Sequence, residues 1–172
     1  MATEPISRDL VRIDPLNDTH DRAVFVSGVE PLDRYLRTQA GQDVRKRVSS
    51  CFVLTEDRTN PLGFHTLAAT SIALTDLPAE AAKKLPRYPI VPATLMGRLA
   101  VDHRMRGRRL GELMLMDAFS RALRSEIATY AFVVDAKDEV AESFYKAYRF
   151  LPLAVSGRRL FLPMAEIAKL FA

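Results

Sequence analysis

Glycine and arginine residues are grouped in one segment at the spacing of an anion-binding loop. An apolar run over residues 93–101 leads into the basic segment 106–111 (RGRRLG), after which apolar residues recur at helical intervals. The first N–H groups of a helix have no partner within the helix and lie at the positive end of its dipole. Glycine lets a phosphate approach the backbone closely, and arginine adds charge. We therefore predict a phosphate site where a buried strand passes through a basic loop into a helix.

A second segment, residues 138–150, carries an aromatic pair within an amphipathic helix. Phe144 and Tyr145 share the apolar face with Ala141 and Tyr148, while acidic and basic residues occupy the other face. On spacing alone, Tyr145 is a core tyrosine. A phenol has a pKa near 10, so at neutral pH it can also donate a proton or a hydrogen bond.

Both segments resemble signatures of the GNAT N-acetyltransferases. Residues 106–111 are similar to the family's pyrophosphate loop, R/Q-x-x-G-x-G/A, and residues 138–150 are similar to its N-x-x-A-x-x-(L/F)-Y-x-x-x-G-F segment. Two arginines depart from these patterns. Arg109 replaces the middle glycine of the loop, where backbone approach becomes less close or is supported by the guanidinium. Arg149 replaces the later glycine, which we interpret as an altered helix C-cap rather than an altered site.

The resemblance implies an α/β fold of the GNAT type, with a mixed central sheet, splayed central strands and flanking helices. It implies one N-acetyltransferase domain over residues 1–172, acetyl-CoA as the acetyl donor, and no metal. Tyr145 is the implied proton donor to the leaving thiolate. The implied coenzyme-binding residues are Leu99, Ala100, Val101, Arg106, Gly107, Arg108, Arg109, Leu110, Gly111, Asp138 and Phe144. Leu99 and Val101 would act through their backbone N–H groups, which is compatible with core side chains.

Three further segments resemble the acetyltransferase toxins of bacterial toxin–antitoxin pairs. They are residues 25–36 (FVSGVEPLDRYL), 97–102 (GRLAVD) and 142–145 (ESFY). The resemblance implies acetylation of the α-amine of aminoacyl-tRNA, which stops translation. It also implies neutralisation by a small antitoxin with a ribbon-helix-helix DNA-binding half, and a toxin that forms a homodimer.

The segment between Pro92 and Val101 contains no Asp or Glu. Many acetyltransferases carry a general base in this segment. An α-amine has a pKa near 8, and esterification of the carboxyl lowers it further, whereas a lysine amine has a pKa near 10.4. An α-amine is therefore partly neutral at pH 7 without a base. The lack of an acidic residue in this segment therefore favours an aminoacyl ester or a peptide α-amine as the acceptor.

Basic residues gather in clusters, although the formal net charge is only +4. Such clusters are either solvated surface or sites for a polyanion, since each phosphate contact releases counterions. Phosphates of the coenzyme would account for the arginines of segment 104–109 but not for the others. The candidates for tRNA binding are Arg45, Lys46, Arg47, Lys83, Lys84, Arg87 and Arg98.

Composition excludes several other classes of protein. No apolar run approaches the roughly 20 residues of a membrane span, and residues 1–5 do not resemble a secretory signal. A single cysteine, Cys51, excludes an internal disulfide and suits a reducing cytoplasm. Two other functions stay open: acetylation of a small-molecule or protein amine, and a non-catalytic basic module that binds nucleic acid.

The elements that must position these residues follow from apolar periodicity. Strands are expected at residues 10–13, 49–55, 62–74, 93–101, 130–134, 150–153 and 159–163, and helices at 31–43, 108–127, 138–148 and 165–171. In the helix at 31–43, we expect Asp33 and Arg37 to form an i,i+4 pair on the exposed side. In the helix at 108–127, we expect Leu113, Met116, Leu123 and Ile127 to face inward. Residues 76–92 form a proline-containing excursion, either a plain surface connection or a substrate-facing loop.

Overall fold

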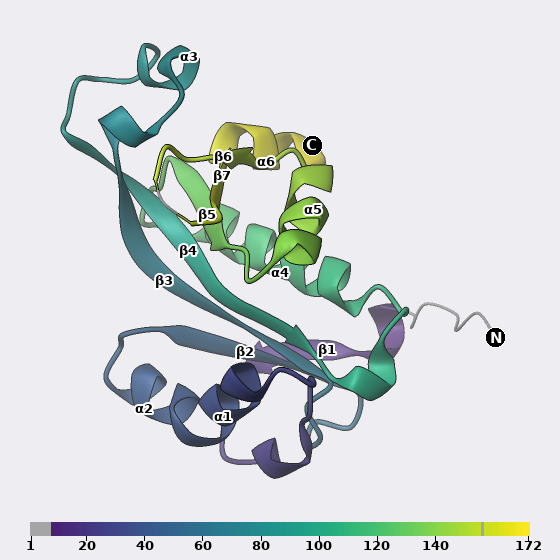
Figure 1. Cartoon of the computed structure of the whole chain (residues 1–172). Coiled ribbons are helices and arrows are strands. Elements are labelled where there is room, and N and C mark those ends of the chain that lie inside the picture. Colours follow the sequence, from purple (N-terminus) through teal and green to yellow (C-terminus); the bar gives the residue numbers. More distant parts are fainter. Residues whose placement is uncertain (1–7, 156) are drawn as a thin grey trace. The chain divides into compact units, whose positions relative to one another are not determined.

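The computed structural model describes residues 8–155 and 157–172 (Figure 1). Seven strands form one mixed sheet in the order β1-β2-β3-β4-β5-β7-β6. Strands β4 and β5 are parallel, and the other recorded pairings are antiparallel. The predicted α/β class, with a mixed sheet and helices, is confirmed.

Internal contacts group the chain into two compact units. Unit 1 comprises Met1–Ala68 and Gly97–Ala118, and unit 2 comprises Ala69–Met96 and Phe119–Ala172. Strands β3 (Gly63–Ala73) and β4 (Ile90–Val101) and helix α4 (Leu110–Arg124) each run from one unit into the other. The expectation of a single N-acetyltransferase domain over residues 1–172 stays a prediction.

Unit 1 contains the strands β1 (Arg12–Pro15) and β2 (Ser50–Thr55), and the helices α1 (Glu30–Thr38) and α2 (Ala40–Arg45). The single helix expected at residues 31–43 is thus wrong, because the helix is interrupted at Gln39. This residue ends α1 and begins α2, and its side chain donates to Asp43 at 2.8 Å. The Thr38 hydroxyl also donates to the Arg34 carbonyl at 2.8 Å, a local bond of the kind that competes with regular helix.

Side chains alternate across the strands of unit 1 and build two cores. On one face, Phe25, Tyr35, Leu36, Val53 and Phe64 pack together with Ala100. On the other face, Leu54 packs with Leu110 and Met114 of α4 and with the half-buried Leu99 and Val101. Because neighbouring residues such as Val53 and Leu54 point to opposite faces, one short strand supports both cores.

Unit 2 is built on the central strand β5 (Ala131–Asp135), which is buried from Ala131 to Val134 as its apolar sequence predicts. It pairs with β4 on one side and with β7 (Arg159–Pro163) on the other, and β7 pairs with β6 (Leu151–Pro152). Helices α5 (Glu139–Ala147) and α6 (Met164–Leu170) complete the unit.

The inward face expected for helix α4 is wrong. Its buried residues are Leu110, Met114, Leu115, Ala118, Phe119 and Ala122, whereas Leu113, Met116 and Leu123 are half-buried. Ile127 lies beyond the end of the helix and is 79% exposed. Apolar residues occur around most of the first turns of α4, so periodicity alone did not distinguish two neighbouring faces.

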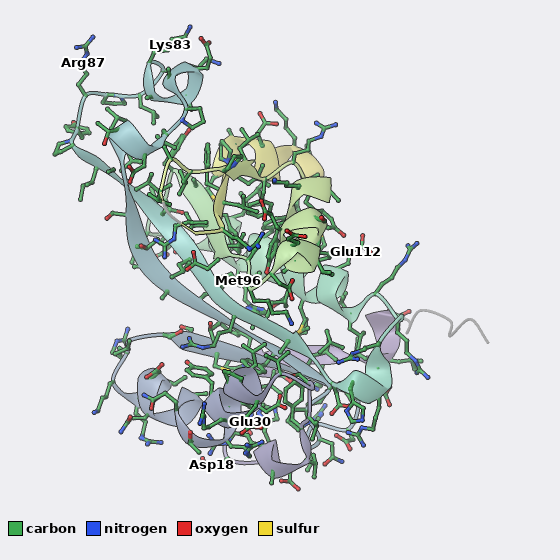
Figure 2. The ribbon with its side chains drawn as sticks, in the orientation of Figure 1. Asp18, Glu30, Lys83, Arg87, Met96 and Glu112 are labelled. Atoms are coloured by element: carbon green, nitrogen blue, oxygen red, sulfur yellow. The ribbon has the colours of Figure 1, made fainter. Side chains whose placement is uncertain are left out.

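The excursion between β3 and β4 contains a 3-10 turn (Leu74–Asp76) and the short helix α3 (Ala79–Ala82). At its base, the Leu74 N–H donates to the Pro89 carbonyl at 3.0 Å. Figure 2 shows Lys83 and Arg87 at the outer end of this excursion, with their side chains directed away from it. Within residues 8–155 and 157–172, no helix has the length and apolar character needed to cross a membrane.

Candidate active site

The strand that leads into the basic loop is β4. Its register with β5 begins at Ala93–Ala131 and ends at Met96–Val134, although β4 continues to Val101. Leu99 and Val101 therefore have no register partner among the described residues of β5. Their side chains belong to the core on the α4 face, so a role for either residue would use its backbone.

Asp102, directly after β4, is the buried anchor of the loop. Its side chain is fully buried and accepts from the Arg104 backbone N–H at 3.0 Å, from Arg104 Nε at 2.9 Å and from the Val26 N–H at 3.1 Å. Burial by itself raises the pKa of Asp102, but the hydrogen bonds from Arg104 and Val26 outweigh it and lower the pKa. The carboxylate thus ties the start of the loop to the segment that precedes α1.

Arg106 forms a second hydrogen bond between the loop after β4 and the segment that precedes α1. Its Nη2 donates to the Ser27 carbonyl at 2.8 Å. Gly28 adopts φ +90°, and a Cβ there would lie 2.9 Å from Arg106 Nη2. The left-handed backbone favours glycine at this position, and a side chain there would displace the end of Arg106, whose guanidinium is partly engaged within the protein.

At position 109, where the family pattern has glycine, the loop keeps a left-handed backbone although the residue is arginine. Gly107 has φ +79° and Arg109 has φ +59°, so an arginine occupies the left-handed conformation. Non-glycine residues enter this region at a cost of about 1–2 kcal/mol. Arg108 Nε is buried and has no hydrogen-bond partner among the residues that the structure describes. A buried donor without an acceptor, next to the N-terminus of α4, suits an anionic ligand.

In unit 2, α5 holds the aromatic pair of the second segment. Asp138 caps the helix, its Oδ1 accepting from the Ala141 N–H at 2.8 Å. Tyr145 is 6% exposed, with ring centroids 5.2 Å from Phe144 and 5.5 Å from Phe150. Burial, assisted by the nearby carboxylate of Asp135, raises the pKa of Tyr145. The phenol therefore stays protonated at neutral pH.

Arg149 forms the C-terminal turn that fixes Tyr145. It has φ +72°, and its N–H donates to the Lys146 carbonyl at 2.9 Å, while the Phe150 N–H donates to the Tyr145 carbonyl at 3.4 Å. These two bonds, with the contact between Tyr145 and Phe150, define a Schellman motif. The interpretation of Arg149 as a helix C-cap residue agrees with this geometry.

The basic side chains outside the loop differ in whether their charges are already paired. Arg159 binds Asp135 at 2.8 and 2.9 Å, and Arg158 binds Glu142 at 2.6 Å. Lys83 pairs with Glu80 at 2.8 Å. In contrast, Arg45, Lys46 and Arg47 at the end of α2, and Lys84 and Arg87 after α3, are exposed and have no ion pair within the described ranges.

The remaining tRNA candidate, Arg98, lies on β4 with its guanidinium carbon 3.5 Å from the centroid of the Tyr35 ring. Sequence reasoning did not identify this stack, nor the buried role of Asp102. Asp33, expected on the wet side of its helix, is instead 3% exposed and accepts from the Ser27 N–H at 2.9 Å. A signal for Asp102 was available, because an acid directly after a buried strand is placed to cap the next turn.

Two alternative kinds of chemistry find no support. Burial raises the pKa of Cys51 to about 12, so the thiol stays protonated and is not a nucleophile. Across the part of the chain that the structure describes, no three His, Cys, Asp or Glu side chains are grouped to hold a metal ion.

Comparison with known proteins gives relatives in both sequence and structure, although no family model matches the chain. A protein described as tRNA-acetylating toxin from Mycobacterium tuberculosis (strain ATCC 25618 / H37Rv) is 36% identical over 137 residues, which cover 78% of this chain and 81% of that protein. A probable toxin TacT from Sinorhizobium fredii (strain NBRC 101917 / NGR234) is 29% identical, covering 92% and 93%.

Among solved structures, AtaT complexed with acetyl-methionyl-tRNAfMet is 29% identical and covers 94% of this chain and 99% of its own, with a TM-score of 0.85. AtaTR bound with acetyl-CoA is 26% identical, covers 95% and 99%, and has a TM-score of 0.84. Sequence and fold thus agree over most of the chain. This chain belongs to the family of tRNA-acetylating toxins.

Proposed function

We propose that this protein transfers an acetyl group from acetyl-CoA to the α-amine of aminoacyl-tRNA, as the toxin of a toxin–antitoxin pair. The observation that carries the proposal is the 36% identity to a tRNA-acetylating toxin over 78% of the chain. AtaT and AtaTR, of closely similar fold, were solved with acetyl-methionyl-tRNAfMet and with acetyl-CoA.

The basic loop is the proposed site for the coenzyme pyrophosphate. The segment from Arg106 to Gly111 would offer backbone N–H groups at the start of α4, and the unpaired Nε of Arg108 supports this assignment. The coenzyme arm would then bind along the end of β4, through backbone groups of Leu99, Ala100 and Val101. Asp138 and Phe144 are proposed to contribute from α5.

In the proposed reaction, the neutral α-amine attacks the thioester carbonyl carbon. The new C–N bond forms, and the C–S bond breaks after a tetrahedral intermediate. Backbone N–H groups near Leu99 would stabilise the oxygen of that intermediate. Tyr145 would donate its hydrogen bond, and then its proton, to the sulfur as negative charge develops there. The attacking amine would release its proton to solvent. Tyr145 would then regain a proton from solvent.

An α-amine acceptor agrees with the lack of an acidic residue between Pro92 and Val101. The product cannot act as a nucleophile in peptide-bond formation, so slow turnover would still deplete usable tRNA. Such an enzyme requires control, and we propose a small antitoxin with a ribbon-helix-helix DNA-binding half. We also propose a homodimer acting in the cytoplasm.

The direct test is incubation of the purified protein with labelled acetyl-CoA and total charged tRNA. The expected product is labelled N-acetyl-aminoacyl-tRNA, which loses its label when the ester is hydrolysed. Uncharged tRNA is the control, since it has no α-amine. If the label appears only on a small-molecule or protein amine, the acceptor assignment is wrong while the acetyltransferase assignment stands.

A second test is biological. Expression of the protein alone should arrest bacterial growth, and peptidyl-tRNA hydrolase, which cleaves N-blocked aminoacyl esters, should relieve the arrest. A catalytically silent variant at Tyr145 should not arrest growth at equal expression. Unimpaired growth at high expression of the active protein would contradict the toxin role.

A further inference from the structure

Arg98 is held in a defined position without a direct ion pair to any residue that the structure describes. It is half-buried, and its guanidinium carbon lies 3.5 Å from the centroid of the Tyr35 ring. Arg98 makes no hydrogen bond or ion pair with any residue that the structure describes. Hydrogen bonds from Gln39 and Tyr35, together with the positive charge of Arg98, lower the pKa of the nearby Asp43. A guanidinium stacked on a ring still has its N–H donors free in its own plane, where they can bind an oxyanion in a bidentate manner.

The ring beneath Arg98 is itself fixed. Tyr35 is 6% exposed, and its ring stacks on Phe64 with centroids 6.2 Å apart. Its hydroxyl donates to Asp43 Oδ2 at 2.9 Å. Burial and the bond to Asp43 raise the pKa of Tyr35 to about 12, so the ring stays neutral. Asp43 is therefore engaged by the phenol, and it forms no ion pair with Arg98.

Arg98 lies on the face of β4 opposite to the proposed coenzyme loop. Its ring partner Tyr35 belongs to the core that contains Phe64 and Ala100. Leu99 and Val101 point to the other core, where they pack with the start of α4. A phosphate bound at the N-terminus of α4 and a phosphate bound at Arg98 would thus lie on opposite faces of the same strand.

We propose that Arg98 is a positioning residue that binds the phosphate next to the 3′-terminal nucleoside of the acceptor, and so presents the aminoacyl ester to the acetyl group. The proposal rests on the proposed function. Phosphate is the oxyanion that an aminoacyl-tRNA end supplies, and Arg98 directly precedes the backbone groups proposed to hold the acetyl carbonyl. The exposed Arg45, Lys46 and Arg47 belong to the same unit and offer further phosphate contacts.

The first experiment uses charged tRNA with the wild-type protein and the variants Arg98→Ala and Arg98→Lys. One charged hydrogen-bonded contact corresponds to about a 10- to 100-fold loss of kcat/KM, which we expect for Arg98→Ala. Arg98→Lys keeps the charge but loses the planar fork, so it should recover only part of the loss. The salt slope of tRNA binding should fall by about 0.7–0.9 for one lost phosphate contact. Acetyl-CoA affinity should not change, and loss of the stack on Tyr35 should lower the unfolding temperature by only about 2–4 °C.

The second experiment locates the phosphate by using aminoacyl esters of adenosine and of adenosine 5′-phosphate. Arg98→Ala should lower kcat/KM only for the phosphorylated ester, which a merely structural role would not produce. Tyr35→Phe keeps the ring but removes the hydroxyl that engages Asp43. The freed carboxylate would compete for Arg98, so this variant should show a smaller loss than Arg98→Ala, again only for the phosphorylated ester.

An equal loss on both esters, or weakened acetyl-CoA binding, would overturn the proposal. If instead the wild-type protein acetylates no charged tRNA, the proposed function itself fails, and the two failures are distinguishable.

Discussion

The two units contribute chemically different parts to the proposed reaction. In unit 1, the candidate residues are arginines and backbone groups held by hydrogen bonds, such as Arg104 on Asp102 and Arg106 on the Ser27 carbonyl. In unit 2, the candidate for proton transfer is one phenol buried among aromatic rings. The candidate residues of unit 1 are thus suited to bind anions, and the phenol of unit 2 is suited to donate a proton. Changes in the basic loop of unit 1 should alter affinity for the coenzyme, whereas removal of the phenol in unit 2 should alter turnover.

The largest effect is expected from Tyr145→Phe in unit 2. The change removes one hydroxyl and little volume, so the packing with Phe150 should persist. A positioned general acid contributes about 10²–10⁴-fold in rate, and kcat should fall in that range. Rapid-quench or steady-state acetylation of charged tRNA measures the loss, with calorimetry showing unchanged acetyl-CoA affinity. Full turnover would return Tyr145 to a purely structural role.

The next effect is expected from Gly111→Glu in unit 1. The carboxylate would repel the pyrophosphate and block its approach to the start of α4. Acetyl-CoA affinity should fall by about 10- to 100-fold, the range of a lost charge-assisted contact. Gly111→Ala is the matched control, because it adds a side chain without charge. Unchanged affinity in a folded Glu variant would remove the loop from the coenzyme site.

A smaller effect is expected from the basic cluster at the end of α2. We expect the triple variant Arg45→Ala, Lys46→Ala and Arg47→Gly to weaken tRNA binding and to lower its salt slope by about 2–3. Glycine is chosen at position 47 because Arg47 has φ +58°. Acetyl-CoA affinity should stay the same.

The matched control removes three exposed basic residues from unit 2: Arg124, Arg158 and Lys169, each replaced by Ala. Arg158 and Lys169 already pair with Glu142 and Glu166. The net charge change is the same in both triple variants, so a difference between them reports the local surface rather than the overall field. Equal tRNA affinity and salt slope in both triple variants would identify the α2 cluster as ordinary solvated surface.

The sequence predicted the parts of the fold that depend on local periodicity and composition. The apolar run at residues 130–134 gave a buried central strand, and residues 106–111 lead from the loop after β4 into the first turn of α4 as expected. The buried face of α4 was wrong, because its first turns are apolar on most sides. Burial there depends on which strands pack against the helix, and local sequence does not contain that information.

Long-range side-chain bonds were equally beyond sequence reasoning. Asp102 bonds Val26 across 76 residues of chain, and Arg106 bonds Ser27 across 79. Asp33 is buried because it accepts from Ser27, although its spacing from Arg37 suggested an exposed pair. The stack of Arg98 on Tyr35 likewise joins residues from a strand and a distant helix. Each depends on the tertiary fold, so residue type and spacing identified the candidates but not their partners.

The smallest effect is expected when an arginine with a left-handed backbone is replaced by glycine, once in each unit. Arg109 and Arg149 both have left-handed φ values, +59° and +72°. Glycine relieves the left-handed penalty of about 1–2 kcal/mol but costs about 0.5–1 kcal/mol in chain entropy. Arg109→Gly and Arg149→Gly should therefore each stabilise the protein by about 0.5–1 kcal/mol, or about 1–4 °C in Tm.

Coenzyme affinity should separate these two variants. Arg149 forms a helix C-cap in unit 2, so Arg149→Gly should leave acetyl-CoA affinity and turnover unchanged. Arg109 lies in the proposed pyrophosphate loop, so Arg109→Gly removes a positive charge there and should weaken acetyl-CoA binding while it raises stability. Thermal unfolding and calorimetry on both variants measure the two quantities independently. If Arg109→Gly binds acetyl-CoA as tightly as the wild-type protein, the guanidinium of Arg109 does not compensate for the missing glycine, and the loop binds through its backbone alone.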